Sequence, residues 1–434
     1  MRKVALICVL MAFDATLVAA AASGELKGGV ARVDLTPPRE IKASLGGYGD
    51  RMSKPAIGVH DRIFAKALVL SDGSKQFALV TADMLAFPPG FKSAVVEAVG
   101  QAGWTADQIM LLPSHSHTSI DMTAINPKNV VGIPQIGIFN KELYDLTVAN
   151  LAKVITDASS NLVAVSVGTS SIELHGWNRN RRRGNTTCDP ELTITRIDKA
   201  NGEPLAVLVN WTAHPTFMGS EDMMFSGGWP GHMQRTVEAL VGQGVTAMYY
   251  NGAEGDQSPV PRSDSGRSNW ERAERYGREL GIVVWREWEK IKPTRSPVFS
   301  YSYEEITLPE RTWHPNFMKT GGAEYGLDEQ IIQKVIAAMV PLKTASGSLR
   351  LGDLLIVGIP GEMAVGLGMS IESQVRHAAG AKHVVIGGLA NEWVSYILAA
   401  DEYKKGGYEA SVSFYGETLG QVIVEGAVKG ASRL

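Results

Sequence analysis

Cysteine is almost absent from this 434-residue chain. It occurs twice, as Cys8 and Cys188, and Cys8 lies in an N-terminal stretch typical of a signal peptide. The single cysteine left after cleavage cannot form an internal disulfide, so stability must come from a packed core, which a chain of this length can supply. Cys188 fits either a catalytic nucleophile or a small buried hydrophobic residue, and we favour the second reading.

Long hydrophobic runs are also scarce. Residues 1–22 begin with Arg2 and Lys3, continue through an apolar stretch at 4–13 and end in small residues, the pattern of a cleaved signal peptide. The apolar stretch is far shorter than the roughly 20 residues that span a bilayer. The sequence therefore predicts a signal peptide at 1–22 and a secreted or periplasmic mature chain at 23–434.

No charge of one sign dominates. The chain has 42 Lys and Arg against 45 Asp and Glu, a formal net charge of -3, which provides no electrostatic footprint for nucleic acid. No obligate protein partner is indicated. Four arginines gather at 179–183, a cluster that fits either a solvated loop or a site for an anionic or polar headgroup.

Strand-like and helix-like segments alternate along the chain. The apolar runs 77–81, 206–210 and 354–358 are typical of strands, whereas 230–241 and 270–288 repeat apolar residues at helical spacing. No repeat or low-complexity linker divides the chain. We predict an α/β (mixed α+β) fold, as a single large catalytic domain with a mixed sheet and surrounding helices.

Polar residues suited to chemistry follow the strand-like runs. They are His115 and His117 after 111–113, His214 after 207–211, Ser258 after 248–251, and Glu362 after 356–360. Loops at strand ends are where scaffolds of this class place functional residues. The pattern indicates a site assembled from four loops.

Two interpretations stay open for most of these residues. In an extended segment His115 and His117 point to the same side, which suits a zinc ion with about three protein ligands, but His214 by itself also fits a buried core histidine. A lone buried carboxylate at Glu362 costs several kcal/mol unless it is paired or metal-bound, although it could instead cap a following helix. Ser258 fits a nucleophile, an oxyanion donor or an ordinary turn serine, and it lacks the Gly-x-Ser-x-Gly elbow.

The order of the short motifs resembles the catalytic domain of neutral, non-lysosomal ceramidases. The matching segments are Asp34-Leu35-Thr36-Pro37, Gly58 to Ala67, His115-Ser116-His117, Asn178-Arg179, Ala213-His214, Gly255-Asp256-Gln257-Ser258-Pro259, Pro360-Gly361-Glu362, and a terminal group from Leu389 to Gly416 that includes Tyr396. The resemblance spans nearly the whole mature chain.

The resemblance implies a role for each matching residue. It implies a Zn²⁺ site of His115, His214, Glu362 and Tyr396, a substrate contact by His117, an arginine near the reacting amide at Arg179 or alternatively Arg181, and a catalytic serine at Ser258. No other cofactor is implied. The expected activity is zinc-dependent hydrolysis of the amide bond of ceramide or another N-acylated lipid, a substrate that would bring the enzyme to a membrane surface.

Several segments depart from the family pattern. Thr118 to Met122 replaces Ser-Gly-Pro, Asn178 to Arg183 replaces Asn-Arg-Ser-Pro, and Gln257 and Val260 replace valine and asparagine. The chain ends soon after Gly416, so we expect no C-terminal immunoglobulin-like domain. Amide hydrolysis therefore transfers more directly than ceramide itself. The alternatives are a zinc hydrolase of another N-acyl or peptide substrate and a non-catalytic binding module.

Overall fold

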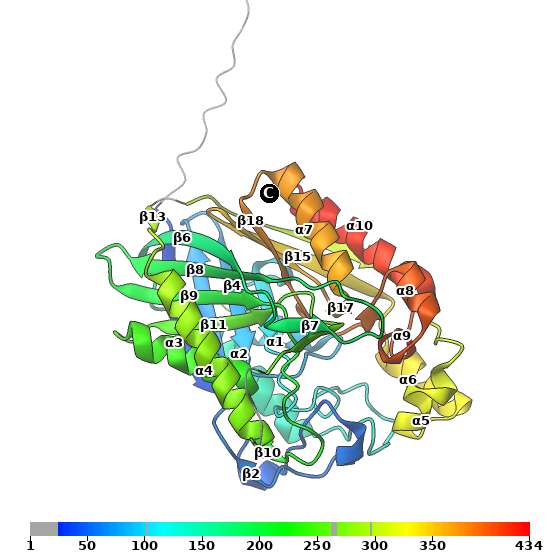
Figure 1. Cartoon of the computed structure of the whole chain (residues 1–434). Coiled ribbons are helices and arrows are strands. Elements are labelled where there is room, and N and C mark those ends of the chain that lie inside the picture. Colours follow the sequence, from blue (N-terminus) through cyan, green and yellow to red (C-terminus); the bar gives the residue numbers. More distant parts are fainter. Residues whose placement is uncertain (1–24, 101–102, 262–266, 296) are drawn as a thin grey trace, which may run out of the picture.

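Two β-sheets lie face to face between layers of helices (Figure 1). The computed structural model describes residues 25–100, 103–261, 267–295 and 297–434. The predicted signal peptide and Cys8 lie outside the described residues. The mixed sheets and flanking helices confirm the predicted α/β class.

The larger sheet has nine strands in the part of the chain described. They are β1 (Lys27–Asp34), β3 (Phe64–Ser71), β4 (Gln76–Ala82), β5 (Ile109–Pro113), β6 (Val163–Glu173), β8 (Glu191–Lys199), β9 (Pro204–Trp211), β11 (Thr246–Asn251) and β13 (Thr294–Arg295). Their order is β11-β9-β8-β6-β1-β3-β4-β5, with β13 paired to β6. The pairs β4–β5 and β9–β11 are parallel, and the other neighbours are antiparallel.

The smaller sheet consists of β14 (Phe299–Thr307), β15 (Lys343–Leu351), β16 (Leu354–Gly358) and β18 (His383–Gly387), and its β16–β18 pair is parallel. Short two-stranded ribbons lie beside the sheets: β2 (Gly58–Val59) with β10 (Met224–Phe225), β7 (Asn178–Asn180) with β12 (Gln257–Pro259), and β17 (Glu362–Met363) with β19 (Tyr396–Ile397).

Helices cover the outer face of each sheet. The larger sheet carries α1 (Phe91–Val99), α2 (Lys141–Ser159), α3 (Gly228–Val241) and α4 (Asn269–Trp288), and the smaller one carries α7 (Val365–Ala379) and α10 (Leu419–Ala431). The remaining helices are α5 (Gly321–Tyr325), α6 (Glu329–Met339), α8 (Ala400–Lys405) and α9 (Tyr408–Ser411). No described helix is both long and apolar enough to cross a membrane.

Strand β9 shows why its sequence is a continuous apolar run. Ala206 and Leu208 lie in the core between the sheets, whereas Val207 and Val209 pack with residues of α3 and α4. A strand covered on both faces has no polar side to present to water. The two predicted helices are confirmed, and α4 begins after Ser268, whose side chain accepts a hydrogen bond from Glu271 N.

Candidate active site

The four predicted loops meet at one end of the sheets. Parallel neighbours end at the same edge, so the segments after β5, β9, β11 and β16 leave the sheets close together. Strands β5 and β11 stand at opposite ends of the larger sheet's order, yet Asn251 Nδ2 donates to Ser114 O at 2.8 Å. This contact joins the end of β11 to the segment that carries the histidine pair.

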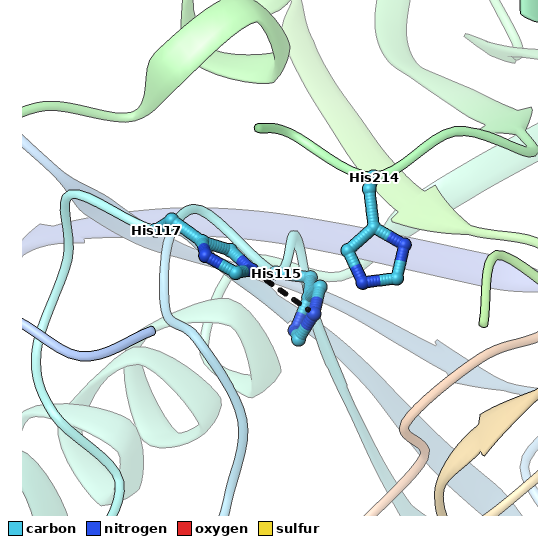
Figure 2. A group of neighbouring side chains, drawn as sticks. All are labelled: His115, His117 and His214. Carbon is cyan, nitrogen blue, oxygen red and sulfur yellow. Dashed lines mark hydrogen bonds between the residues drawn. The ribbon is translucent and has the colours of Figure 1, made fainter. Parts of the chain in front are cut away.

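Three histidines form the centre of the site (Figure 2). The Nε2 atoms of His115 and His117 lie 3.4 Å apart, and the ring centres of His115 and His214 are 4.7 Å apart. His115 has a φ of 64°, a left-handed conformation that is uncommon for a residue with a side chain and that often occurs at functional sites. The structure thus brings together the three histidines that the sequence singled out.

Backbone carbonyls determine which histidine nitrogen faces the centre. The Nδ1 atoms of His115 and His214 lie 2.7 Å from Leu85 O and Glu254 O, respectively. A carbonyl can only accept, so each Nδ1 carries a hydrogen and each Nε2 is the nitrogen that faces the centre. Burial lowers the pKa of His214 to about 3, so that its imidazole is neutral.

Glu362 lies against both of these Nε2 atoms. Its Oε2 atom is 3.0 Å from His214 Nε2 and 3.4 Å from His115 Nε2, while Trp393 Nε1 donates to Oε1 at 2.8 Å. Burial opposes ionisation of this carboxyl, but His115 and His214 hold its pKa well below the usual range. Despite burial, Glu362 in turn raises the pKa of His115.

The helix-cap alternative for Glu362 is wrong. Helix α7 begins at Val365 with Ala364 as its N-cap, and Val365 N donates to Asp256 Oδ1 at 2.9 Å. Glu362 instead pairs with Tyr396 in the β17–β19 ribbon. This pairing brings the tyrosine named by the resemblance to the carboxylate.

Arg181 connects Tyr396 to the surrounding loops. Its Nη2 atom donates to the Tyr396 hydroxyl and to Gly255 O, both at 2.9 Å, and its Nε donates to Glu409 Oε1 at 2.9 Å. Burial and the Glu362 carboxylate raise the pKa of Tyr396 well above its ordinary value, so the phenol stays neutral. Arg182 is likewise engaged, by Glu402 and Glu409, so these two arginines hold the site together instead of forming a solvated loop.

Ser258 and Arg179 lie opposite each other in the β12–β7 ribbon. Directly paired residues project to the same face. Ser258 is half-buried and Arg179 is exposed. Within the described ranges neither side chain hydrogen-bonds to the three histidines or Glu362, and neither residue lines the pocket described below.

Cys188 is half-buried and free. Its Sγ atom accepts a hydrogen bond from Asn180 N at 3.2 Å, and burial raises the pKa of the thiol. A thiol with a raised pKa is a poor nucleophile, which agrees with a structural role.

Sequence reasoning missed Trp393 and Glu254. Trp393 holds Glu362, and Glu254 is a fully buried carboxylate whose oxygen lies within 4.8 Å of donor atoms of His115 and Glu362. Burial raises the pKa of Glu254 to about 8. The sequence signal that could have identified Glu254 is its place between the apolar strand β11 and the turn at Gly255.

A pocket of about 180 Å³ opens from this centre. His115, His117, Glu362 and Tyr396 line it together with a large apolar wall. That wall includes Leu45, Leu85, Ile136, Phe317, Leu327, Ile332, Val335, Met339, Val412 and Phe414. Reactive polar groups therefore face a cavity suited to a ligand with a long apolar part.

The donor set fits a metal cation. Neutral His214 directs a lone pair at the ionised Glu362 across 3.0 Å, and His115 and His117 direct Nε2 atoms at the same space. Lone pairs facing each other repel unless a cation lies between them. Two or three imidazoles and one carboxylate are typical zinc ligands.

The fold is shared with solved ceramidase structures. The crystal structure of neutral ceramidase from Pseudomonas aeruginosa superposes with a TM-score of 0.76 at 20% identity, covering 94% of this chain and 75% of that chain. A solved structure of ceramidase complexed with C2 also superposes with a TM-score of 0.76. The architecture is therefore that of a ceramidase-type catalytic domain.

Sequence comparisons identify the family. Residues 27–264 and 330–424 match the family model for neutral/alkaline non-lysosomal ceramidase, N-terminal. The neutral ceramidase of Pseudomonas aeruginosa is 23% identical over 94% of this chain and 72% of its own length, and neutral ceramidase B of Dictyostelium discoideum is 25% identical over 52% of this chain and 34% of its own. The chain belongs to this family of amide-bond hydrolases, which confirms the resemblance drawn from the motifs.

Proposed function

We propose that this protein is an exported zinc amidohydrolase that cleaves the amide bond of an N-acylated lipid, with ceramide as the leading candidate. Residues 23–434 would form the hydrolase domain after removal of residues 1–22. The observation that carries the proposal is the opening of the histidine–glutamate cluster directly into a largely apolar pocket. Family membership and the relatives named neutral ceramidase support the same activity.

The zinc ion would be held by His115, His214 and Glu362, with Tyr396 beside them. When bound, zinc lowers the pKa of a coordinated water to about 7 and polarises a carbonyl group. The Leu85 and Glu254 carbonyls fix the orientation of the two imidazoles. Such outer contacts typically determine ligand orientation and metal affinity.

The remaining groups would act on the amide. Tyr396, a neutral phenol held by Arg181, can donate a hydrogen bond to the oxygen that becomes negative in the transition state. Burial and the neighbouring histidines keep the pKa of His117 well below its ordinary value, so this neutral imidazole is able to bind substrate. Exposed Arg179 and half-buried Ser258, which are paired in the β12–β7 ribbon, would supply polar contacts to the substrate.

Ser258 has two roles compatible with its position. It could donate a hydrogen bond to the developing oxyanion, or it could attack the carbonyl and form an acyl-enzyme that water then hydrolyses. A burst of amine release in rapid-quench kinetics, lost in Ser258→Ala, would identify the serine as the nucleophile.

The apolar wall indicates which part of the substrate enters the pocket. Phe317, Val335 and Phe414 offer no hydrogen bonds from their side chains, so a hydrocarbon chain fits there better than a peptide with unpaired amide groups. We therefore place the acyl chain in the pocket and the amine toward Arg179. A lipid substrate would require the enzyme to work at a membrane surface.

Zinc content and substrate preference can be tested together. Elemental analysis should find zinc in the wild type, and amine release should be faster for an N-acyl sphingoid base than for an N-acyl amino acid or a peptide. His115→Ala and Glu362→Ala should lose both zinc and activity, whereas His175→Ala, an exposed histidine paired with Glu173, should keep both. Full activity of zinc-free protein would refute the proposal, and preference for a peptide would reassign the substrate.

A further inference from the structure

The most unusual group outside the assigned ligands is the carboxylate of Glu254. The residue has no exposed surface, and neither carboxylate oxygen has a hydrogen-bond partner among the described residues. An unpaired carboxylate in such a place is destabilising by several kcal/mol. As an anion, this group requires a positive charge nearby that the protein's own donors do not supply.

The neighbouring donors are already engaged. His115 and His214 use Nδ1 for backbone carbonyls and turn Nε2 toward Glu362, and Trp393 donates to Glu362. Arg181 is bonded to Gly255 O, Tyr396 and Glu409. None of these side-chain donors forms a hydrogen bond to Glu254 among the described residues.

The carboxylate is nevertheless within reach of the metal centre. Oxygen and nitrogen donors of His115, Glu254 and Glu362 all lie within 4.8 Å of one another. Zinc–ligand bonds to nitrogen and oxygen are about 2.0–2.2 Å long, so donor atoms this close together could converge on one ion after a side-chain movement on the order of 1 Å. On the other side, a Cβ at Gly388 would come within 2.6 Å of Glu254 Oε2, so the glycine leaves room for the carboxylate.

We infer that Glu254 is an additional carboxylate ligand of the ion held by His115, His214 and Glu362. This inference rests on the proposed zinc site and extends its ligand set. Charge supports it, because a divalent cation neutralises the two carboxylates Glu254 and Glu362, while Arg181 is balanced by Glu409. A bound cation also removes the lone-pair repulsion and the unpaired buried charge together.

Zinc affinity of the full chain tests the inference independently of catalysis. Apoprotein would be titrated with zinc in competition with a chromophoric chelator, for wild type, Glu254→Gln, Glu254→Leu and the control Glu287→Gln. Loss of an outer-shell partner alone changes metal affinity by about 10- to 100-fold, so both Glu254 variants should bind zinc at least about tenfold more weakly. Glu287 is a buried carboxylate bonded to Ser170 and Lys290, and its variant should match the wild type.

Two further measurements separate ligation from a structural role. The visible spectrum of the cobalt-substituted protein should change in Glu254→Leu, because the number of ligands changes. In the absence of metal, Glu254→Leu should unfold at a temperature no lower than the wild type, since it removes an unpaired buried carboxylate, while its stabilisation by zinc should be smaller.

The outcomes distinguish the inference from the proposed function. Tight zinc binding by the wild type together with unchanged affinity and cobalt spectrum in both Glu254 variants would overturn the inference and leave the zinc site intact. A wild type that binds no zinc would overturn the proposed function and this inference with it.

Discussion

Val335→Phe should shorten the acyl chain that the enzyme accepts. Val335 is 6% exposed on α6 and lines the apolar wall of the pocket with Ile332 and Met339. A phenyl ring at this position would occupy part of a cavity of only about 180 Å³. Because the polar centre is formed by other segments, the chemistry itself should be unaffected.

The magnitude follows from the burial of methylene groups. Each methylene that enters an apolar pocket contributes about 0.8 kcal/mol, or about fourfold in kcat/KM. Overfilling a packed cavity costs about 1–3 kcal/mol, which corresponds to about 5- to 150-fold. We therefore expect kcat/KM for a long-chain N-acyl substrate to fall by about 5- to 150-fold, while an N-acetyl substrate with the same amine should change by less than about twofold.

The assay is amine release across a series of N-acyl chain lengths on one amine. Gln333→Phe is the matched control, because it adds the same ring to an exposed position of α6 and should leave the chain-length profile unchanged. An equal loss for the acetyl and long-chain substrates in Val335→Phe would refute the placement of the acyl chain along α6.

Three other changes test the site and the core. Glu362→Gln should weaken zinc binding at least about 100-fold, measured by chelator competition, because it removes the charge between two imidazoles; unchanged affinity would contradict its role as a ligand. Tyr396→Phe retains the buried ring and should lower kcat by about 10²- to 10³-fold through loss of one oxyanion donor, whereas full activity would exclude the phenol from catalysis. Lys92 is buried without a hydrogen-bond partner among the described residues, and burial lowers its pKa to about 7. The pKa of Lys92 is lower in the folded state than in the unfolded state. The contribution of Lys92 to the free energy of unfolding is therefore fully present above about pH 10.5 and is lost as the pH falls through about 7. Lys92→Met should therefore raise the free energy of unfolding by about 1–3 kcal/mol at pH 6.5 and by less at pH 9.5; a gain independent of pH in denaturant titrations would contradict the assignment.

Much of the fold could be predicted because local pattern determines secondary structure. The continuous apolar runs became strands β4, β9 and β16, and the stripe at 270–288 became α4, with bounds within a few residues. Periodicity reports which faces are buried. It does not report which strands become neighbours, so the stacking of two sheets and the approach of β5 to β11 could not be predicted.

The candidate site was predictable only in part. His115, His214 and Glu362 could be named because metal-ligand residue types followed strands in a family order. In the structure the Nε2 atoms of both histidines lie within 3.4 Å of Glu362 Oε2. The roles of Ser258, His117, Arg179 and Tyr396 remain predictions for experiment. Glu254 escaped because an acidic residue before a turn is ordinary in sequence and unusual only once it is buried.

The sequence by itself determined which residue types form the site and that they follow strands. It also determined the family, and that the mature chain has too few cysteines for an internal disulfide. Tertiary structure alone decided that Glu362 faces the histidines instead of capping α7, that Arg181 is the arginine bound to Tyr396, and that Glu254 is buried without a partner. The physical reason is distance along the chain. His214 and Glu362 are 148 positions apart, and contacts of this kind depend on sheet order and side-chain packing, which no local pattern encodes.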